Sequence, residues 1–115
     1  ELGSTAEKLV RHGMYVEHDL GRLHMQELEA AVKRVIDGDE ESKLDVIANA
    51  ISYTHLLHRH IDKEDKVVYV YAQNNLAKET MDRLNQECKN FEQKDTSNAV
   101  REKYIALIDE LDSRV

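Results

Sequence analysis

A histidine and a glutamate lie four residues apart in the most histidine-rich stretch of the chain, residues 55–72. At about 100° per residue, His60 and Glu64 fall on one face of a helix, about one turn apart, so both side chains can reach a single ion. The stripe that carries them is otherwise apolar. His55 and His58 fall on other faces of the same helix. An imidazole and a carboxylate directed into an apolar seam form a ligand pair suited to iron, manganese or zinc.

A metal-free explanation fits the same spacing. A histidine on an apolar face is often a core residue that hydrogen-bonds a polar neighbour, and Glu64 is available to His60 as its i,i+4 partner. The metal site and the hydrogen-bonded core histidine both stay open on spacing alone. The remaining histidines are expected to be solvated: His12, His24, His55 and His58.

The segment before this stretch predicts a long first helix over residues 5–37. Ser4 and Glu7 have the spacing of a capping box, and Gly38 ends the periodic pattern. The stripe of this helix that carries His18 also includes Met14, Gly21, Met25, Val32 and Ile36. His18 is therefore expected to point inward, as His60 does.

A second long helix is predicted over residues 43–73, with Ser42 as its N-cap. Because the acidic turn before it is short, the two long helices should form an antiparallel hairpin. His18 and His60 lie at nearly equal distances from this turn. They are therefore expected at the same height, where they can share one metal ion with Glu64.

Gly21 follows His18 by about one turn of the first predicted helix. Glycine there costs about 1 kcal/mol relative to alanine. Close approach of a neighbouring helix or of a ligand beside His18 would explain its presence, and chance is the alternative.

Two shorter helices without histidine are predicted over residues 77–93 and 97–113, where we expect packing roles only. Cys88 is expected to be a buried apolar filler. A chain of 115 residues with no proline and 34% charged residues indicates one all-α domain, residues 1–115, with long solvated faces. The predicted fold class is a helical bundle of two long antiparallel helices and two shorter ones.

Charge and composition exclude several classes of function. The net charge of −7 leaves no basic stripe for a nucleic-acid backbone. No apolar run is long enough for a membrane span and no signal-like segment opens the chain, so a soluble, cytoplasmic protein is expected. The single cysteine allows no internal disulfide, and no Ser/His/Asp or Cys/His arrangement for nucleophilic catalysis can be assembled.

Two segments resemble the motifs of hemerythrin-like (HHE cation-binding) domains. Residues 17–22, E-H-D-L-G-R, are similar to the family's E-H-x-x-G-R, and residues 60–72 are similar to H-I-x-K-E-D-x-V-L-F-P-M-A. The resemblance implies a helical bundle that holds a non-haem di-iron centre. It also implies that His18, His60 and Glu64 are metal ligands, with Glu64 as a bridging carboxylate.

The chain departs from the family pattern in three respects. It matches only the second half of such a domain, without the earlier histidine helix and the earlier His-x-x-x-Glu motif. The family's Phe-Pro-Met is replaced by residues 69–71, which places the phenol of Tyr71 on the stripe that faces the metal. Asp65 matches the family's acidic doublet and is a possible substitute or helper for Glu64.

Three protein ligands are about half of what a di-iron centre requires. Two copies related by a twofold axis would supply four histidines and two glutamates, so a homodimer is predicted. The competing explanation is a truncated product of a longer protein, whose N-terminal half-domain is missing or present as another fragment. A monomer that holds one ion with His18, His60 and Glu64 is the third.

The predicted function is that of a non-haem iron protein, with a di-iron centre expected and manganese or zinc as other candidate metals. It would bind or react with a small ligand such as dioxygen, nitric oxide or peroxide, or it would handle iron. The alternatives are a metal-free helical interaction module and an oxidative di-iron enzyme that uses Tyr71.

Overall fold

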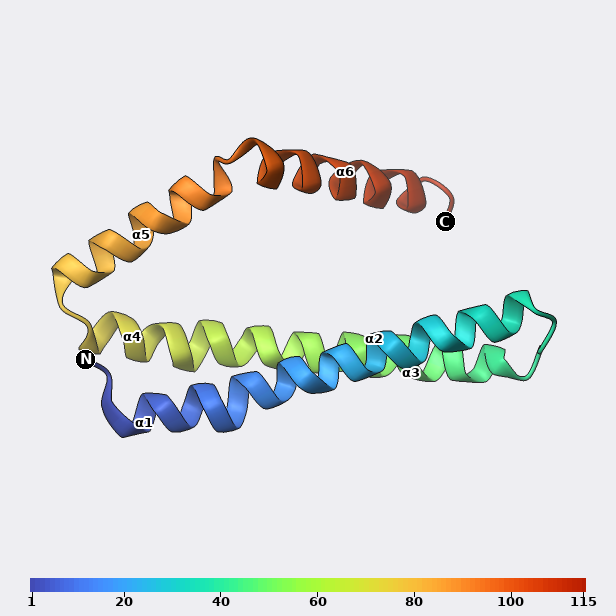
Figure 1. Cartoon of the computed structure of the whole chain (residues 1–115), viewed down its shortest axis with the longest axis horizontal. Helices are drawn as coiled ribbons and strands as arrows, with labels where there is room; N and C mark the ends of the chain where they lie inside the picture. Colours follow the sequence, from blue (N-terminus) through green and yellow to red (C-terminus); the bar gives the residue numbers. More distant parts are fainter. The chain divides into compact units, whose positions relative to one another are not determined.

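Helices are the only regular elements of the protein, as the computed structural model of all 115 residues shows (Figure 1). In chain order the elements are α1 Gly3–Lys8, the π-helix η1 Leu9–Met14, α2 Tyr15–Ile36, α3 Ser42–Lys63, the π-helix η2 Glu64–Val68, α4 Tyr69–Asn75, α5 Lys78–Glu92 and α6 Asp95–Asp112. Several of them follow one another directly, which gives four helical stretches. The all-α prediction is confirmed, and the predicted helix boundaries differ from the observed ones by no more than two residues.

The chain divides into two compact units, residues 1–75 and residues 76–115. The first contains the long hairpin and all six histidines. The second contains α5 and α6. The units are described separately, and the single domain over residues 1–115 stays a prediction.

A polar network closes the turn between α2 and α3, which lie side by side as an antiparallel pair (Figure 1). Arg34 donates from Nε to Ser42 Oγ at 2.8 Å and from Nη2 to Asp45 Oδ2 at 2.9 Å. Ser42 Oγ donates in turn to Asp39 Oδ2 at 2.8 Å. Gly38 turns the chain with a φ of +106°, a conformation that L side chains rarely adopt. The network fixes how α2 and α3 are aligned at this end of the hairpin.

The predicted side-chain caps at the two long helices are wrong. The first helical stretch begins at Gly3, and the second begins at Ser42 itself, with no side-chain cap at either. Ser42 is the first residue of α3 and not its N-cap, and its hydroxyl bonds to Arg34 and Asp39 instead.

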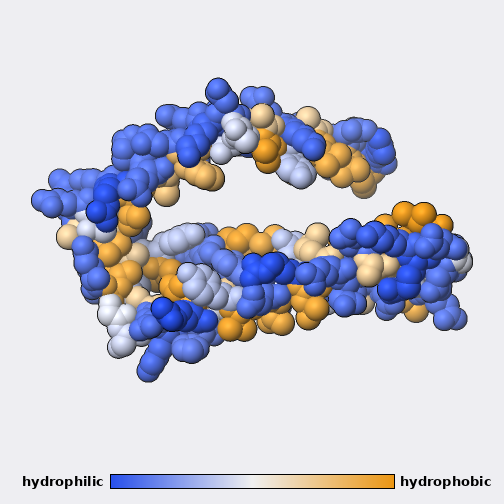
Figure 2. Space-filling model, viewed as in Figure 1, coloured by the Kyte–Doolittle hydropathy of each residue, from blue (hydrophilic) through white to orange (hydrophobic).

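The buried apolar seam of the hairpin is narrow. The buried apolar residues of the chain are Ala6, Met14, Ala31 and Leu56. Larger apolar side chains on the same helices stay open to solvent, and the space-filling view has apolar surface along the outside of the hairpin (Figure 2). The expectation of an inward stripe on the first helix is therefore wrong for Met25, Val32 and Ile36, which are 45%, 39% and 77% exposed. Two helices cover each other along one strip only, and the side chains of Met25, Val32 and Ile36 lie at or beyond the edge of that strip.

Both long helical stretches contain a π-helical segment at the end of the hairpin away from the turn. The amide of Tyr15 bonds to the carbonyl of Val10, and the amide of Tyr69 bonds to the carbonyl of Glu64, five residues back in each case. A π-helical turn holds more residues than an α-helical one, so side chains beyond it rotate to another face. An α-helical wheel therefore misplaces residues after Glu64.

The second unit consists of α5 and α6, and none of the residues of either helix is buried. Cys88 is exposed, so its predicted role as a buried filler is wrong. The apolar stripe of α5 that includes Cys88 is largely uncovered, since Leu84 and Phe91 on it are exposed as well. No helix of the protein combines the length and the apolar character that a membrane span requires.

Two glycines of the hairpin should respond to alanine in opposite directions. A Cβ at Gly21 would lie 3.6 Å from Tyr53 Cε2 and 3.7 Å from Leu56 Cδ2, which is ordinary van der Waals contact. Gly21→Ala should therefore raise the free energy of unfolding by about 1 kcal/mol through helix propensity. Gly38→Ala should lower it by about 1–3 kcal/mol because of the positive φ. Urea unfolding of the metal-free variants measures both, and a destabilised Gly21→Ala would contradict the packing described.

Candidate metal centre

Three side chains from the two long helices converge on one point. The Nε2 atoms of His18, on α2, and His60, on α3, lie 3.0 Å apart. Glu64, the first residue of η2, brings Oε1 to 3.0 Å from His60 Nε2. The three donor atoms all lie within 4.8 Å of one another. The prediction that the histidines stand at the same height and meet Glu64 is confirmed; that they bind a metal stays a prediction.

The donor spacing fits a single small cation. Two ligands at about 2.1 Å from one ion stand about 3.0 Å apart when their bonds meet at about 90°, and about 3.4 Å apart at a tetrahedral angle. Both short donor pairs measure 3.0 Å. Two nitrogens and one oxygen suit iron, manganese or zinc.

The three side chains differ in burial. His60 is buried at 7% exposure, Glu64 is half-buried and His18 is exposed. The expectation that His18 lies in a buried stripe is wrong, because its edge of α2 is uncovered by α3. The cluster therefore opens on the side of His18, where its ring lies tilted against that of His60 with the ring centroids 4.6 Å apart.

Glu17 is a part of the site that the sequence reasoning missed. Its Oε2 lies 3.3 Å from His60 Nδ1, and its side chain is only 11% exposed. It also forms an ion pair with Lys63, one turn beyond His60 on α3. In the sequence Glu17 appears only as the neighbour of His18 in a motif. On a helical wheel Glu17 lies about 100° from His18 and outside its stripe, so residue spacing gave no reason to expect it against α3.

The Lys63 ammonium lowers the pKa of the Glu17 carboxyl below its ordinary value of 4.5, chiefly by hydrogen bonding and also by charge attraction. Burial of the carboxyl opposes this shift, and the contact with His60 adds to it. Glu17 is therefore held as a carboxylate against the imidazole.

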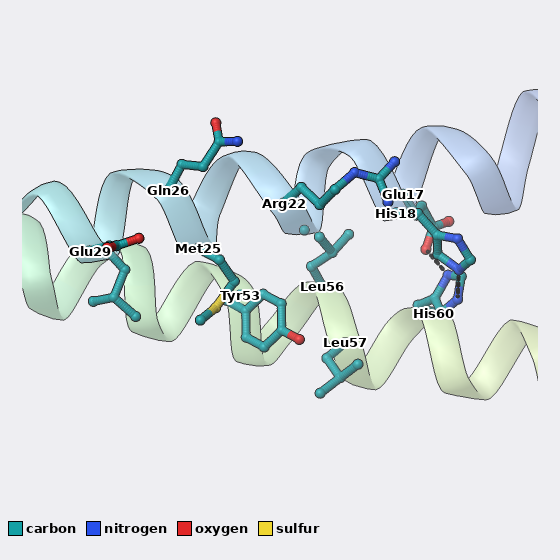
Figure 3. A pocket seen from close by; sticks show the side chains of 12 residues that line it. Glu17, His18, Arg22, Met25, Gln26, Glu29, Tyr53, Leu56, Leu57 and His60 are labelled. Atoms are coloured by element: carbon teal, nitrogen blue, oxygen red, sulfur yellow. Dashed lines mark hydrogen bonds and ion pairs between the residues drawn. The ribbon is translucent and has the colours of Figure 1, made fainter. Parts of the chain in front are cut away.

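A groove of about 620 Å³ leads to the cluster along α2 and α3. Glu17, His18 and His60 lie together at one end of it (Figure 3). The groove continues past Tyr53 and Leu56, and most of its lining is apolar. The groove is therefore polar at the end that holds the candidate metal ligands, and its apolar remainder is open to solvent.

Two residues that the motif comparison placed near the metal lie elsewhere. Asp65 is exposed and outside the cluster. The Tyr71 hydroxyl donates to the backbone carbonyl of Leu2 at 3.3 Å, so the expected phenol at the metal-facing stripe is wrong. Eleven residues of helix separate Tyr71 from His60, or about 16 Å, and η2 rotates it further.

The remaining histidines follow the prediction with one exception. His12, His55 and His58 are exposed, as expected. His24 is half-buried instead, with Nδ1 3.5 Å from Asn49 Oδ1 across the hairpin. None of them joins the cluster.

Comparison of the chain with protein-family models, with curated proteins and with solved structures finds no match. The similarity of residues 17–22 and 60–72 to the hemerythrin-like motifs therefore stays a prediction.

The lowered pKa of Glu17 makes stability depend on pH in a defined direction. Its contribution is present above pH 4.5 and is lost as the pH falls through the lowered pKa. The free energy of unfolding of the wild type should fall in this range by up to about 1 kcal/mol more than that of Glu17→Gln, a small amount because Lys63 is half-exposed.

Urea unfolding of metal-free protein at a series of acidic pH values measures this difference. Asp19→Asn removes an exposed carboxyl two residues away and serves as the matched control. Equal slopes for the wild type and Glu17→Gln would show that the ion pair does not stabilise the fold.

Proposed function

We propose that this chain is a non-haem iron-binding protein of the hemerythrin-like type. The observation that carries the proposal is the convergence of His18 Nε2, His60 Nε2 and Glu64 Oε1, with both neighbouring pairs at 3.0 Å. Two imidazoles and a carboxylate that meet in this way are a donor set for one divalent cation. The motif resemblance favours iron, and manganese and zinc are the other metals that the donor set would accept.

Each residue has a separate task in this proposal. His60 and Glu64 present adjacent donors from one helix, and His18 presents the third from the facing helix. The motif resemblance implies that the carboxylate of Glu64 would also bridge to a second ion. Iron held there would supply a coordination position at which a small ligand such as dioxygen, nitric oxide or peroxide binds or reacts.

The lining of the groove favours a small, weakly polar molecule as the ligand. Its apolar lining along Met25, Tyr53 and Leu56 ends at the histidine pair. The two cationic side chains near that end are both paired, Arg22 with Asp19 and Lys63 with Glu17. An approach of this kind suits a diatomic molecule better than a charged metabolite, and simple handling of iron is compatible with it as well.

A second copy of the chain is proposed to complete the metal site by supplying a further three donors. The cluster offers three protein donors and opens at the exposed His18, while Met25 and Leu57, which line the groove that leads to it, are 45% and 40% exposed. A twofold axis at this face would cover the apolar side chains and bring a second set of three donors to the first. A separate chain that carries the complementary half-domain is the alternative occupant.

One observation favours a metal-free interaction module as the second candidate. A protonated His60 can donate from Nδ1 to Glu17 and from Nε2 to Glu64, which lie 3.3 Å and 3.0 Å away. Both ring nitrogens would then be satisfied without a metal. The oxidative enzyme has no comparable support, because the Tyr71 hydroxyl is bound to Leu2.

Metal analysis of protein purified without chelator separates these candidates. The wild type should retain about one iron per chain, and His60→Ala and Glu64→Gln should each lose most of it, since each removes one of only three protein ligands. Asp65→Asn and His55→Ala should keep the wild-type content because both side chains are exposed and neither belongs to the cluster. Equal iron content in all five proteins, or none in the wild type, would remove the proposed site.

Sedimentation equilibrium tests the twofold completion. Leu57→Lys should convert a dimer to a monomer, because it puts a charge in the face beside the cluster. Leu44→Lys provides the matched control, since Leu44 is 71% exposed on another face of α3. A wild-type protein that stays monomeric with iron bound would instead favour the single-ion site or a separate half-domain.

A further inference from the structure

The His60 ring has different partners at its two nitrogens. Nε2 faces His18 and Glu64 at 3.0 Å, and Nδ1 faces Glu17 Oε2 at 3.3 Å. The ring is buried, so its rotation is restricted by its surroundings. Glu17 comes from α2 and the ring from α3, so this contact crosses the hairpin at the level of the cluster.

A neutral imidazole that binds a metal through Nε2 must carry its proton on Nδ1, and that N–H requires an acceptor. Glu17 occupies this acceptor position. Lys63 then holds the carboxylate from the far side with an ion pair to Oε1, so that one oxygen is directed to Lys63 and the other to His60. The carboxylate is thereby oriented as well as charged.

We propose that Glu17, held by Lys63, is a positioning residue that fixes the His60 ring with its Nδ1 protonated and its Nε2 lone pair directed to His18 and Glu64. This assignment rests on the proposed metal-binding function for its purpose. The contact itself can be tested without any metal. Outer partners of this type typically change metal affinity by about 10–100-fold when they are removed.

The first experiment reads the His60 tautomer in metal-free protein. Glu64 also faces the ring, so it is removed: the full chain carrying Glu64→Ala is labelled with ¹⁵N and studied by long-range ¹H–¹⁵N NMR near pH 8.5, about two units above the ordinary histidine pKa. We expect His60 protonated on Nδ1. Adding Glu17→Ala should abolish that tautomer. Protonation on Nε2 while Glu17 is intact would overturn the assignment.

The second experiment measures Co²⁺ affinity by the visible spectrum of the bound ion. Glu17→Ala should weaken binding by about 10–100-fold. Glu17→Gln should recover part of the loss, because an amide oxygen still accepts from Nδ1. Asp19→Ala removes a carboxylate from the exposed side of the same helix turn and should leave the affinity within about twofold.

The two experiments separate the failure of this inference from the failure of the proposed function. If the wild type binds no Co²⁺, the proposed function fails, and the NMR result alone decides whether Glu17 sets the tautomer. If Co²⁺ binds equally well to wild type and Glu17→Ala, with unfolding curves that show both are folded, the positioning role is overturned while the metal site stands.

Discussion

The alignment of α2 against α3 is the constraint on which the rest of the molecule depends. Sliding one helix by a single residue moves its side chains by about 1.5 Å along the axis and 100° around it. His18 would then no longer meet His60. The turn network of Arg34, Ser42 and Asp39 fixes this alignment at one end of the hairpin, and the ion pair of Glu17 with Lys63 fixes it near the other.

The alignment of α2 with α3 brings the His60 imidazole between the carboxylates of Glu17 and Glu64. An apolar seam that buries so few side chains has little reason to contain an imidazole between two carboxylates, unless the group binds something. Two bound species satisfy the arrangement: a proton on His60, or a cation shared with His18 and Glu64. His18 distinguishes them, because a proton on His60 Nε2 needs only Glu64 as its partner, whereas a cation uses all three donors.

Helical periodicity predicted most of the scaffold from the sequence. The four helical stretches, the hairpin and the equal height of His18 and His60 follow from apolar spacing and from a short turn without strand formers. The same reasoning failed for Tyr71, because a helical wheel ignores the distance of about 16 Å along the axis and because no periodicity reveals a π-helical segment before it is observed. It also failed for the burial of His18, Met25 and Cys88, since a helical wheel identifies an apolar face without showing whether anything covers it. The role of Glu17 was missed because a helical wheel places it about 100° from the stripe of His18, so nothing in the sequence marked it as facing α3.

The proposal that the hairpin is a half-site for iron rests on its uncovered face and on its three-donor cluster. X-ray absorption at the iron edge of the loaded protein tests this proposal most directly. It predicts nitrogen and oxygen ligands at about 2.0–2.2 Å, with the outer-shell scattering of about two imidazoles per iron. An iron spectrum with oxygen ligands and no imidazole scattering would contradict it.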